Sequence, residues 1–597
     1  MLSTSPFKLP RKTPFGLGEH IAEWATGLHQ LDKFYAQRPA GCDTAQFLRF
    51  TLEVLGIDYQ VVKGALGQVP QTGATVVVAN HPLGCVEGVI LAELLLTRRT
   101  DIKILANHYL KTVPELDELF IGVDVFETSK AHKANLLALR QAHKHLEQGG
   151  LLLMFPAGEV SQWVDSKRVD SKQRRLEDKE WSQSVSRLIK KHKAKSVPVY
   201  IDGQNSKRFY MAGKIHPLLR TLMLGRELLN KKQHCIDIAI GETIHYKEVN
   251  DLCDQQLVNY LRLNTYLLHN PATITRNKTA QDSSLVPIEA RLPLDDLRQD
   301  IARLSFSDHL LRHNELDVYC TRAENIPAIL HEIGRVRERN FRQVGEGTGL
   351  SLDIDEFDRD YLHLFIWDRD QELLVGAYRL GLVDELLASR GLDGLYSSTL
   401  FQYDPRFLHN MGKAIEMGRS VIDEAYQKSM APLLLLWKGI ATYVQRHPDY
   451  THLFGPVSIS SDYSDQARRL LADTMTLHYY DQAQAELVEA TNPLPVGQNL
   501  WNASLLTSLA DLQLLSRVIA RIDEGKGIPV LLRQYLGLNG KLVSFNIDPD
   551  FNDALDGLIV VDLRHVPQRT LARYMGSDEA QHYLDHHAQS PDLTVLT

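Results

Sequence analysis

The chain has 597 residues, of which 44% are hydrophobic and 23% are charged. This length exceeds the roughly 250 to 300 residues at which one core stops growing, so two or more domains are expected in a globular protein. Five scattered cysteines without metal-like spacing argue against a disulfide framework. The sequence shows neither an apolar leader near its start nor a run of about 18 apolar residues, so we expect no secretory signal and no spanning helix.

Five short apolar runs in the first half alternate with longer amphipathic stretches. This alternation predicts an α/β domain with a mainly parallel sheet. The predicted strands are 74–80, 102–106, 151–158, 196–202 and 235–241, and residues 133–150 are predicted to form a helix.

A basic block follows the third of these strands. Residues 163–232 hold 18 Lys and Arg against 7 Asp and Glu, whereas the whole chain has a net charge of −8. Such a block suggests an anionic partner, either a membrane surface or a nucleic acid, and a solvated helical face is the alternative. The block contains few interleaved aromatic residues, which argues against nucleic acid.

The second half begins after a polar stretch, residues 271–287, which is the one credible linker. A helix is predicted at 294–304. Further strands are predicted at 362–368, 373–381, 414–422 and 453–460, with a helix at 430–448 between the last two. We therefore expect two α/β domains, at residues 1–270 and 311–597, joined by a linker with one helix at 271–310.

One candidate site lies in the segment NHPLGCVEG, between a predicted strand and an apolar helix. Ligand sites of α/β sheets gather at such strand ends. A neutral imidazole such as that of His81 accepts a proton from a hydroxyl, and a carboxylate such as that of Glu87 stabilises the resulting cation. From these two residues alone, a purely structural pair remains the alternative.

The wider setting resembles the lysophospholipid acyltransferase superfamily over about residues 60–245. The resemblance rests on NHPLGCVEG, LANHYLKTVPELDELFIGVDVF, LLLMFPAGEVS and SVPVYIDG, in the family's order. It implies that His81 is the general base that activates an acceptor hydroxyl against an acyl thioester, and that Glu87 orients it. The residues that it implies for acceptor or acyl binding are Asn80, Gly84, Phe155, Pro156, Gly158, Glu159 and Ser161.

Two departures from the superfamily pattern concern the acceptor. Five residues and a Glu follow the His here, where four residues and an Asp are usual; the branch that acylates amino-acid lipids shares this spacing. The third block usually reads FPEGTRS, with an arginine that clamps the acceptor's phosphate. Here it has no arginine and contains Glu159, which favours a cationic or zwitterionic acceptor over lysophosphatidic acid.

A second constellation comprises RVRERNF, LDIDEFDRDYLHLF, VGAYRLG and IEMGRSVI. Charges within apolar strands are unusual, because a buried unpaired charge costs several kcal/mol. One alternative is that Glu416 and Arg419 simply pair across a strand. The whole set, over about residues 315–563, resembles the acyl-homoserine lactone synthases and the ornithine N-acyltransferases, which share a GNAT-like fold and take acyl groups from acyl carrier protein.

This second resemblance implies an N-acyltransferase site. Its residues are Arg337, Phe341, Asp355, Asp358, Arg379, Glu416 and Arg419, with Gly376 on the strand of Arg379. The carboxylates are expected to hold the amino groups of a basic amino acid, and an arginine its carboxylate, while the base for the amine stays open. Residues 425–434 lack the glycine-rich pyrophosphate loop of coenzyme-A-using GNAT proteins, which favours a carrier-protein donor with a single phosphate on its phosphopantetheine.

The two domains together resemble the bifunctional ornithine lipid synthases of bacteria. The resemblance implies N-acylation of ornithine with a 3-hydroxyacyl group by the C-terminal domain, followed by O-acylation of this lyso-lipid by the N-terminal domain. A different amino acid such as glycine, a lysophospholipid acyltransferase and a non-enzymatic haemolysin are the alternatives. We expect no bound cofactor, no metal and no nucleic-acid partner. We also expect a cytoplasmic protein bound peripherally to the anionic inner face of the bacterial cytoplasmic membrane.

Overall fold

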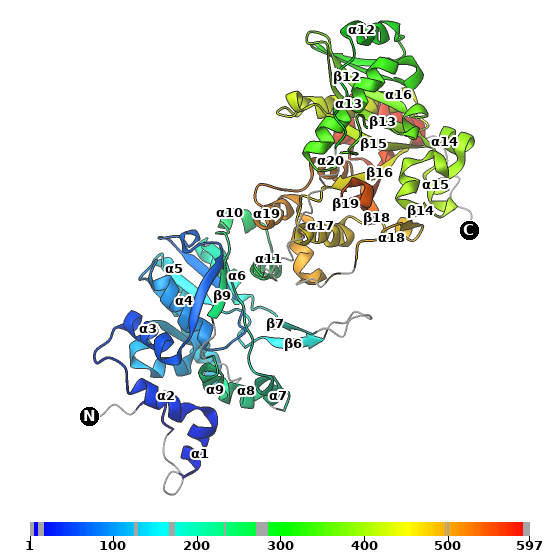
Figure 1. Ribbon diagram of the computed structural model, residues 1–597. Coiled ribbons are helices and arrows are strands. Elements are labelled where there is room, and N and C mark those ends of the chain that lie inside the picture. The colour runs from blue at the N-terminus through cyan, green and yellow to red at the C-terminus, as the bar shows by residue number, and fades with distance from the viewer. Residues whose placement is uncertain are drawn as a thin grey trace. The chain divides into compact units, whose positions relative to one another are not determined.

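The computed structural model describes residues 5–9, 17–123, 129–165, 174–215, 217–231, 235–269, 285–495, 497 and 501–588. The chain divides into two compact units (Figure 1). The first contains residues 1–274 and 499–509, and the second contains 275–498 and 510–597. The sequence had placed 499–509 in the C-terminal domain. Most of the predicted linker, residues 271–284, lies outside the described residues.

The first unit contains a seven-stranded sheet in the order β1-β9-β8-β2-β5-β3-β4. All neighbouring strands are parallel except β8 and β9, which confirms the predicted mainly parallel sheet. Every residue of β2 is buried, as expected for a central strand covered on both faces. The strands are β1 (Asp58–Lys63), β2 (Thr75–Ala79), β3 (Ile102–Asn107), β4 (Phe120–Val123), β5 (Leu151–Met154), β8 (Lys195–Ile201) and β9 (Cys235–Ile240), with a separate hairpin of β6 (Gln162–Asp165) and β7 (Arg174–Glu177).

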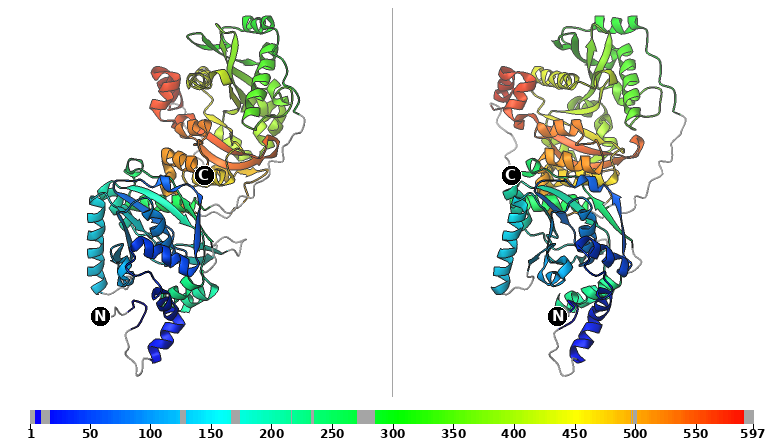
Figure 2. Two further views of the ribbon diagram at one scale, coloured as in Figure 1. Left: turned by 60° about the vertical axis from the view of Figure 1, so that its left-hand side comes forward. Right: turned by 90° about the vertical axis from the view of Figure 1, so that its left-hand side faces the viewer.

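Helices cover this sheet. The α5 helix contacts β3, β4 and β5, while α11 contacts β8 and β2; both views of Figure 2 show α5 as a long cyan helix along the first unit. The helices are α1 (Leu17–Thr26), α2 (Leu28–Tyr35), α3 (Thr44–Leu55), α4 (Val86–Leu96), α5 (Ser129–Glu147), α6 (Ser184–His192), α7 (Lys207–Ile215), α8 (Pro217–Leu222), α9 (Leu224–Leu229), α10 (Tyr246–Val249) and α11 (Asp254–Tyr266).

The second unit contains an eight-stranded sheet in the order β10-β11-β12-β13-β15-β16-β19-β18. Its neighbouring strands are antiparallel except β15 and β16. The strands are β10 (His309–His313), β11 (Leu316–Arg322), β12 (Leu362–Asp368), β13 (Leu373–Leu382), β15 (Ala414–Ile422), β16 (His452–Ile459), β18 (Lys541–Asp548) and β19 (Ala554–Asp562), with a small pair of β14 (Phe401–Tyr403) and β17 (Val488–Ala490).

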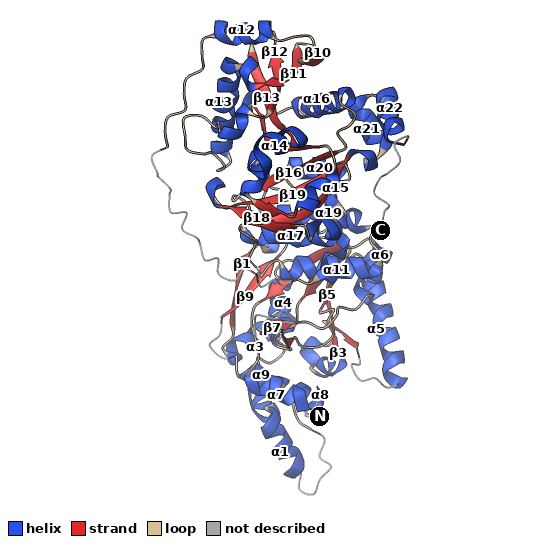
Figure 3. Cartoon of the chain, turned by 90° about the vertical axis from the view of Figure 1, so that its right-hand side faces the viewer, coloured by secondary structure: helices blue, strands red, loops and turns tan. Residues whose placement is uncertain are grey.

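Helices α13 and α16 pack on opposite faces of this sheet (Figure 3). The α13 side buries Tyr319 and Phe365, whereas Gly439 of α16 lies against Val318 and Leu364, and successive strand residues point to opposite faces. The helices of this unit are α12 (Leu294–Arg303), α13 (Pro327–Gln343), α14 (Val383–Arg390), α15 (Pro405–Met411), α16 (Ala431–Arg446), α17 (Asp465–His478), α18 (Gln482–Ala485), α19 (Leu512–Ile522), α20 (Val530–Gly537), α21 (Gln568–Met575) and α22 (Ser577–Ala588).

The predicted helix of the linker forms as α12, but it belongs to the second unit. Its Leu297 is fully buried in the cluster formed with α13, so this segment is part of a core. Among the described residues, no single helix is long and apolar enough to cross a membrane. The segments 503–510 and 512–522 meet the length and composition requirement only together, and the chain bends sharply between them.

The parallel strands β15 and β16 part after three residue pairs. Residues 414–416 pair with 452–454, after which β15 continues along β13 and β16 continues along β19. Gly455 lies where the strands part, and a Cβ atom there would be 2.2 Å from the carbonyl oxygen of Met417. Glycine is therefore required for the close backbone approach that precedes the opening.

We expect Gly455→Ala to destabilise the second unit, because the methyl group would meet rigid backbone. Overpacking of this kind costs about 1 to 3 kcal/mol, measurable as a lower thermal unfolding midpoint. Gly418→Ala on β15 is the matched control, since a Cβ atom there has nothing within 4 Å. Equal unfolding midpoints for the two variants would contradict the close approach.

Candidate functional site

His81 lies directly after the central strand β2, where the backbone is anchored on both sides. The side chain of Asn80 accepts a hydrogen bond from the Ile201 N–H at 2.8 Å and donates to the Ile201 carbonyl at 2.9 Å. The His81 carbonyl accepts from the Ser161 N–H at 2.8 Å. The Phe155 ring lies 4.7 Å from the imidazole, centroid to centroid. Four predicted residues from two blocks therefore meet at one strand end, beside Ile201 of a third block.

His81 and Glu87 form an ion pair. Nδ1 of His81 is 2.9 Å from Oε1 of Glu87, and the glutamate side chain is fully buried whereas the histidine remains 18% exposed. Oε1 also accepts the N–H groups of Leu83 at 2.9 Å and Gly84 at 2.8 Å, while Oε2 has no hydrogen-bond partner among the described residues. Glu87 is in the first turn of α4, where the helix dipole favours an anion.

The pair changes the acidity of both members. Burial lowers the pKa of His81, but the negative charge of Glu87, its hydrogen bond to the imidazole and the charge of Asp178 together outweigh burial, so the pKa rises above its ordinary 6.5. Burial raises the pKa of Glu87, and the charge of His81 and the backbone N–H groups reverse this, so the pKa is lowered. The carboxylate thus stabilises the imidazolium that forms when His81 takes a proton.

Asp178 is a buried partner of the site that the sequence did not predict. Its Oδ1 accepts the hydroxyl of Ser161 at 2.5 Å and the backbone N–H of His81 at 3.2 Å, and its Oδ2 accepts from Trp181 at 2.9 Å. Burial raises its pKa, although these hydrogen bonds oppose the rise. Asp178 lies 97 positions from His81, inside the basic block, where no motif distinguishes it from the surrounding charges.

The third block carries a neutralised glutamate. Oε1 of Glu159 is 3.0 Å from Nζ of Lys179, and its Oε2 accepts from Nη2 of Arg220 on α8 at 2.5 Å. Burial raises the pKa of Glu159, but these two cations outweigh it and lower the pKa. The block itself contains no arginine, but α8 supplies Arg220 from elsewhere in the chain, so Glu159 is paired with cations in the folded protein.

Two of the predicted site residues, Gly84 and Gly158, are glycines with a positive φ. Gly84 has a φ of 97°, and a Cβ atom there would be 2.5 Å from a side-chain carbon of Leu224 on α9. Gly158 has a φ of 69° and lies two residues after Pro156, whose carbonyl accepts from the Ser182 N–H at 2.9 Å. Both glycines therefore occupy backbone conformations that other residues rarely adopt.

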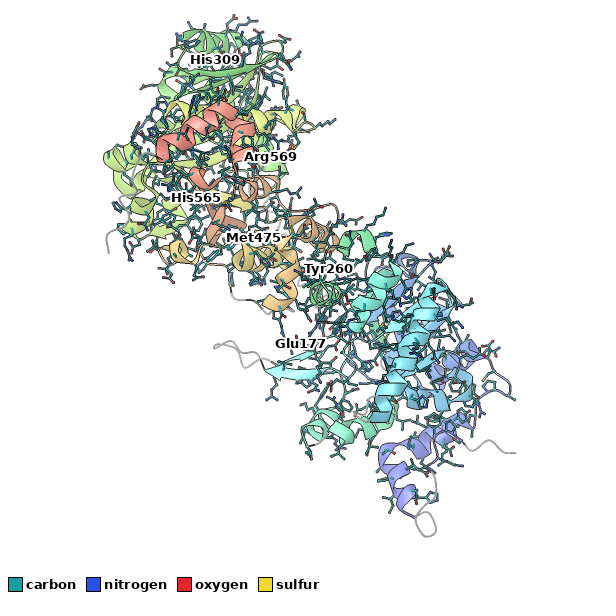
Figure 4. All side chains as sticks on the ribbon, turned by 180° about the vertical axis from the view of Figure 1, so that it is seen from behind. Glu177, Tyr260, His309, Met475, His565 and Arg569 are labelled. Carbon is teal, nitrogen blue, oxygen red and sulfur yellow. The ribbon has the colours of Figure 1, made fainter. Side chains whose placement is uncertain are left out.

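The segment that carries Asp178 is hydrogen-bonded to α11. Arg262 donates to the Asp178 carbonyl at 2.6 Å and to Glu177 at 2.9 Å. Figure 4 labels Glu177 at the end of β7 and Tyr260 on α11. This bond links the strand that precedes Asp178 to the core helix and so fixes the position of the buried aspartate.

The second candidate site is built on a buried network of opposite charges. Arg337 of α13 donates to Asp358 at 2.7 Å, and Arg379 of β13 is 2.5 Å from Asp355 and 3.4 Å from Asp358. Both arginines have no exposed surface. Burial raises the pKa of Asp358, and the two guanidinium groups outweigh it and lower the pKa. Four of the predicted residues are thus in direct contact. Phe341, near the end of α13, instead packs against the hydrophobic core.

Glu416 and Arg419 have different partners, so they are not a simple cross-strand pair. Glu416 is buried and accepts the Ser397 N–H at 2.6 Å, the Tyr396 N–H at 3.2 Å and the Tyr361 hydroxyl. These contacts hold the segment before β14 against the sheet. Glu416 lies at the last paired position before β15 and β16 part.

Arg419 lies three residues further along β15, beside the opening. The register of β13 and β15 shifts here, so two residues of β15 oppose one of β13, and Arg419 adopts a left-handed φ of 49°. Its guanidinium is 3.3 Å from Asp353 and 3.5 Å from Asp355, and it lies over the Phe551 ring at 4.6 Å. A bulged strand redirects its side chain, and here it directs a cation to the point where the strands diverge.

Three further acidic residues lie near Arg419, and the sequence analysis missed all of them. Glu346 follows α13, Asp548 ends β18 and Asp556 is in β19. Burial and neighbouring carboxylates raise the pKa of Asp548, and raise those of Glu346 and Asp556 to about 7, although Arg419 opposes each rise. Asp548 and Asp556 lie 129 and 137 residues beyond Arg419, whereas Glu346 lies only five residues after Phe341 but outside the quoted motifs. The described residues contain no His, Cys, Asp and Glu group that could hold a metal ion.

Comparison with known protein families separates the same two halves. A family described as acyltransferase matches residues 26–274, and one described as acetyltransferase (GNAT) domain matches residues 336–437. These matches confirm the two predicted domain types, and both are α/β in the structure.

Individual relatives carry each type of activity in their names. The chain is 27% identical over 315 residues to a glycine N(alpha)-acyltransferase of Phocaeicola vulgatus, covering 50% of this chain and 94% of the relative. It is 30% identical over 264 residues to the glycine N(alpha)-acyltransferase of Bacteroides thetaiotaomicron, covering 41% and 77%. It is also 27% identical over 213 residues to a lyso-glycine lipid O-acyltransferase of Phocaeicola vulgatus, covering 34% and 69%. This chain therefore belongs to the acyltransferase family of the Bacteroides thetaiotaomicron enzyme, and it joins an acyltransferase domain to a GNAT domain.

Proposed function

We propose that the protein makes an amino-acid lipid in two acyl transfers. The GNAT domain joins a 3-hydroxyacyl group to the amino group of an amino acid, and the N-terminal domain then esterifies the 3-hydroxyl group of that lyso-lipid. The presence of both domain types on one chain carries this proposal, because relatives named for the N-acyl step and for the O-acyl step each match it.

The His81 site supports the ester-forming step. Because Nδ1 faces Glu87, Nε2 is the nitrogen that accepts the proton of the acceptor hydroxyl. The oxygen then attacks the thioester carbonyl, an ester bond forms, the carbon–sulfur bond breaks and the thiol leaves with the proton. Glu87 stabilises the imidazolium during this transfer.

The opening between β15 and β16 supports the amide-forming step. It separates two strands that would otherwise be paired, and the carboxylates around Arg419 border it. For the donor we propose acyl carrier protein, because the loop before α16, AYQKSM, lacks the glycines that cradle a pyrophosphate.

Ornithine is the acceptor that we propose, with glycine as the second candidate. Glu346, Asp548 and Asp556 add negative charge near the opening, and ornithine has a second ammonium group that such charge stabilises. Glycine is favoured by the names of the relatives, which specify glycine and lyso-glycine lipid. Mass spectrometry of the lipid head group decides between the two.

We further propose that one face of the first unit binds an anionic membrane. Its exposed apolar residues, called the lipid-facing surface below, are Ile21 and Trp24 of α1, Met211 and Ile215 of α7, and Leu219 and Leu222 of α8. These helices are linked through α9, which contacts both α1 and α8. Lys207, Arg208 and Arg226 are exposed on the same helices, and near-surface cations add about 1 kcal/mol each to binding of anionic lipid.

Lipid analysis of variants separates the two steps. In a bacterium that lacks amino-acid lipids, His81→Ala should accumulate the mono-acylated lyso-lipid, because loss of a general base slows ester formation about 10²- to 10⁴-fold. Arg419→Ala should remove both lipids, because the second step has no acceptor without the first. Mass spectrometry of extracted lipids measures both outcomes.

Two controls make this test specific. His245→Ala changes an exposed histidine of the same unit and should leave both lipids at the wild-type level. The thermal transition of each variant must match that of the wild type, because an unpaired buried charge can unfold a domain. Loss of both lipids in folded His81→Ala would contradict the assignment of ester formation to the first unit.

The pH dependence of ester formation tests the role of Glu87. His81 acts as a base only when neutral, and its raised pKa keeps it protonated to a pH above 6.5. The rate should therefore fall as pH drops through that raised value. In Glu87→Gln the stabilising charge is gone, so the acidic limb should shift to lower pH while the maximal rate falls. An unshifted limb would show that Glu87 does not set the pKa of His81.

Vesicle binding tests the lipid-facing surface. Ile215→Asp should weaken binding to vesicles that contain phosphatidylglycerol, measured by co-sedimentation, because it places a negative charge at a residue that is 78% exposed. Val62→Asp on β1 is the matched control, since this valine is 55% exposed on an edge strand of the sheet and is not part of the lipid-facing surface. Equal binding by the two variants, or binding insensitive to salt, would contradict the proposal.

A further inference from the structure

Asp556 occupies a distinctive place in the second unit. It is 3% exposed and lies in β19, directly opposite Ser458 of β16, whose hydroxyl donates to Oδ1 at 2.6 Å. Beyond this one bond, no side-chain partner of its carboxylate is found among the described residues. Ser458 lies four residues beyond the last position at which β16 pairs with β15. The nearly buried carboxylate of Asp556 therefore lies beside β16, the strand that borders the opening. Its Oδ1 accepts the Ser458 hydroxyl, and its Oδ2 has no side-chain partner among the described residues.

The surroundings of Asp556 distinguish it from Asp355 and Asp358. Asp358 and Asp355 form ion pairs with arginines. The two guanidinium groups lower the pKa of Asp358, which makes its carboxylate a weak base. Asp556 instead faces the carboxylates of Asp548 and Glu346, with Arg419 as the cation near enough to act on all three. Burial and this negative surrounding raise its pKa to about 7, which suits proton transfer near neutral pH.

We propose that Asp556 is the general base that deprotonates the amino group of the acceptor in the N-acylation step. This inference rests on the proposed function of the second unit and identifies the base of that reaction. Glu346 and Asp548 flank the ammonium group and keep it close, and Ser458 positions the carboxylate.

The step balances without any further reactant. The ammonium group gives one proton to the Asp556 carboxylate, and the free amine attacks the thioester carbonyl. A carbon–nitrogen bond forms and the carbon–sulfur bond breaks as the tetrahedral intermediate collapses. The nitrogen's second proton leaves with the thiolate as thiol, and Asp556 releases its proton to water.

The test is the pH profile of N-acylation by the full-length protein. The donor is a 3-hydroxyacyl carrier protein, and ornithine and glycine are assayed separately as acceptors from about pH 6 to 9.5. The wild-type rate should level off above the pKa of the base. Asp556→Asn should be about 10²- to 10⁴-fold slower near pH 7 and should rise about tenfold per pH unit, because the free amine must then form in solution.

Two other variants separate this role from a structural one. Asp550→Asn, an exposed aspartate on the turn between β18 and β19, is the matched control and should keep the wild-type profile. Ser458→Ala removes a hydrogen bond that lowers the pKa of Asp556, so its acidic limb should shift to higher pH. This second variant also provides a test if Asp556→Asn does not fold.

The outcomes are distinguishable. If the wild type acylates neither amino acid, the proposed function fails and the inference fails with it. If the wild type is active but Asp556→Asn keeps a level profile, or if Ser458→Ala shows no shift, the assignment of the base alone is overturned.

Discussion

Ion pairs and hydrogen bonds between buried groups organise both candidate sites of this protein. Removing an ion from water costs several kcal/mol unless an opposite charge or hydrogen bonds replace the solvent. In the first unit, His81 and two backbone N–H groups satisfy Glu87. In the second, Arg337, Asp358 and Arg379 form a chain of contacts with no exposed guanidinium. Each network fixes the backbone beneath a site, and the groups at its edge remain available for chemistry.

The sequence was most informative where local patterns determine structure. The strand predicted at 414–422 forms over the same residues, because apolar residues at both of its ends and polar flanking segments indicate it. The turn at His81 was predictable because its glycines, proline and paired polar residues lie within nine positions of the chain. Local order of this kind extends to the helices: 430–448 was predicted and α16 spans Ala431–Arg446.

Contacts between distant segments were beyond the sequence alone. Asp178, Arg220 and Asp556 each reach their sites from elements far along the chain, so no spacing rule connects them to the motifs. Glu159 illustrates the consequence. Its charge suggested a cationic acceptor, yet two cations from other elements neutralise it in the folded chain. The electrostatic potential at a site depends on the tertiary structure, whereas a local sequence motif identifies only the individual groups.

The close approach of Leu224 to Gly84 couples the position of α9 to that of the turn that carries His81. A shift of α9 toward the turn would displace Gly84, whose N–H donates to Glu87, the partner of His81. On the neighbouring helix α8, Arg220 donates to Glu159. Thermodynamic linkage makes such a connection reciprocal. If the turn binds substrate as we propose, a partner that favours one position of α9 would change substrate affinity at the turn, and substrate would change the affinity of that partner by the same factor.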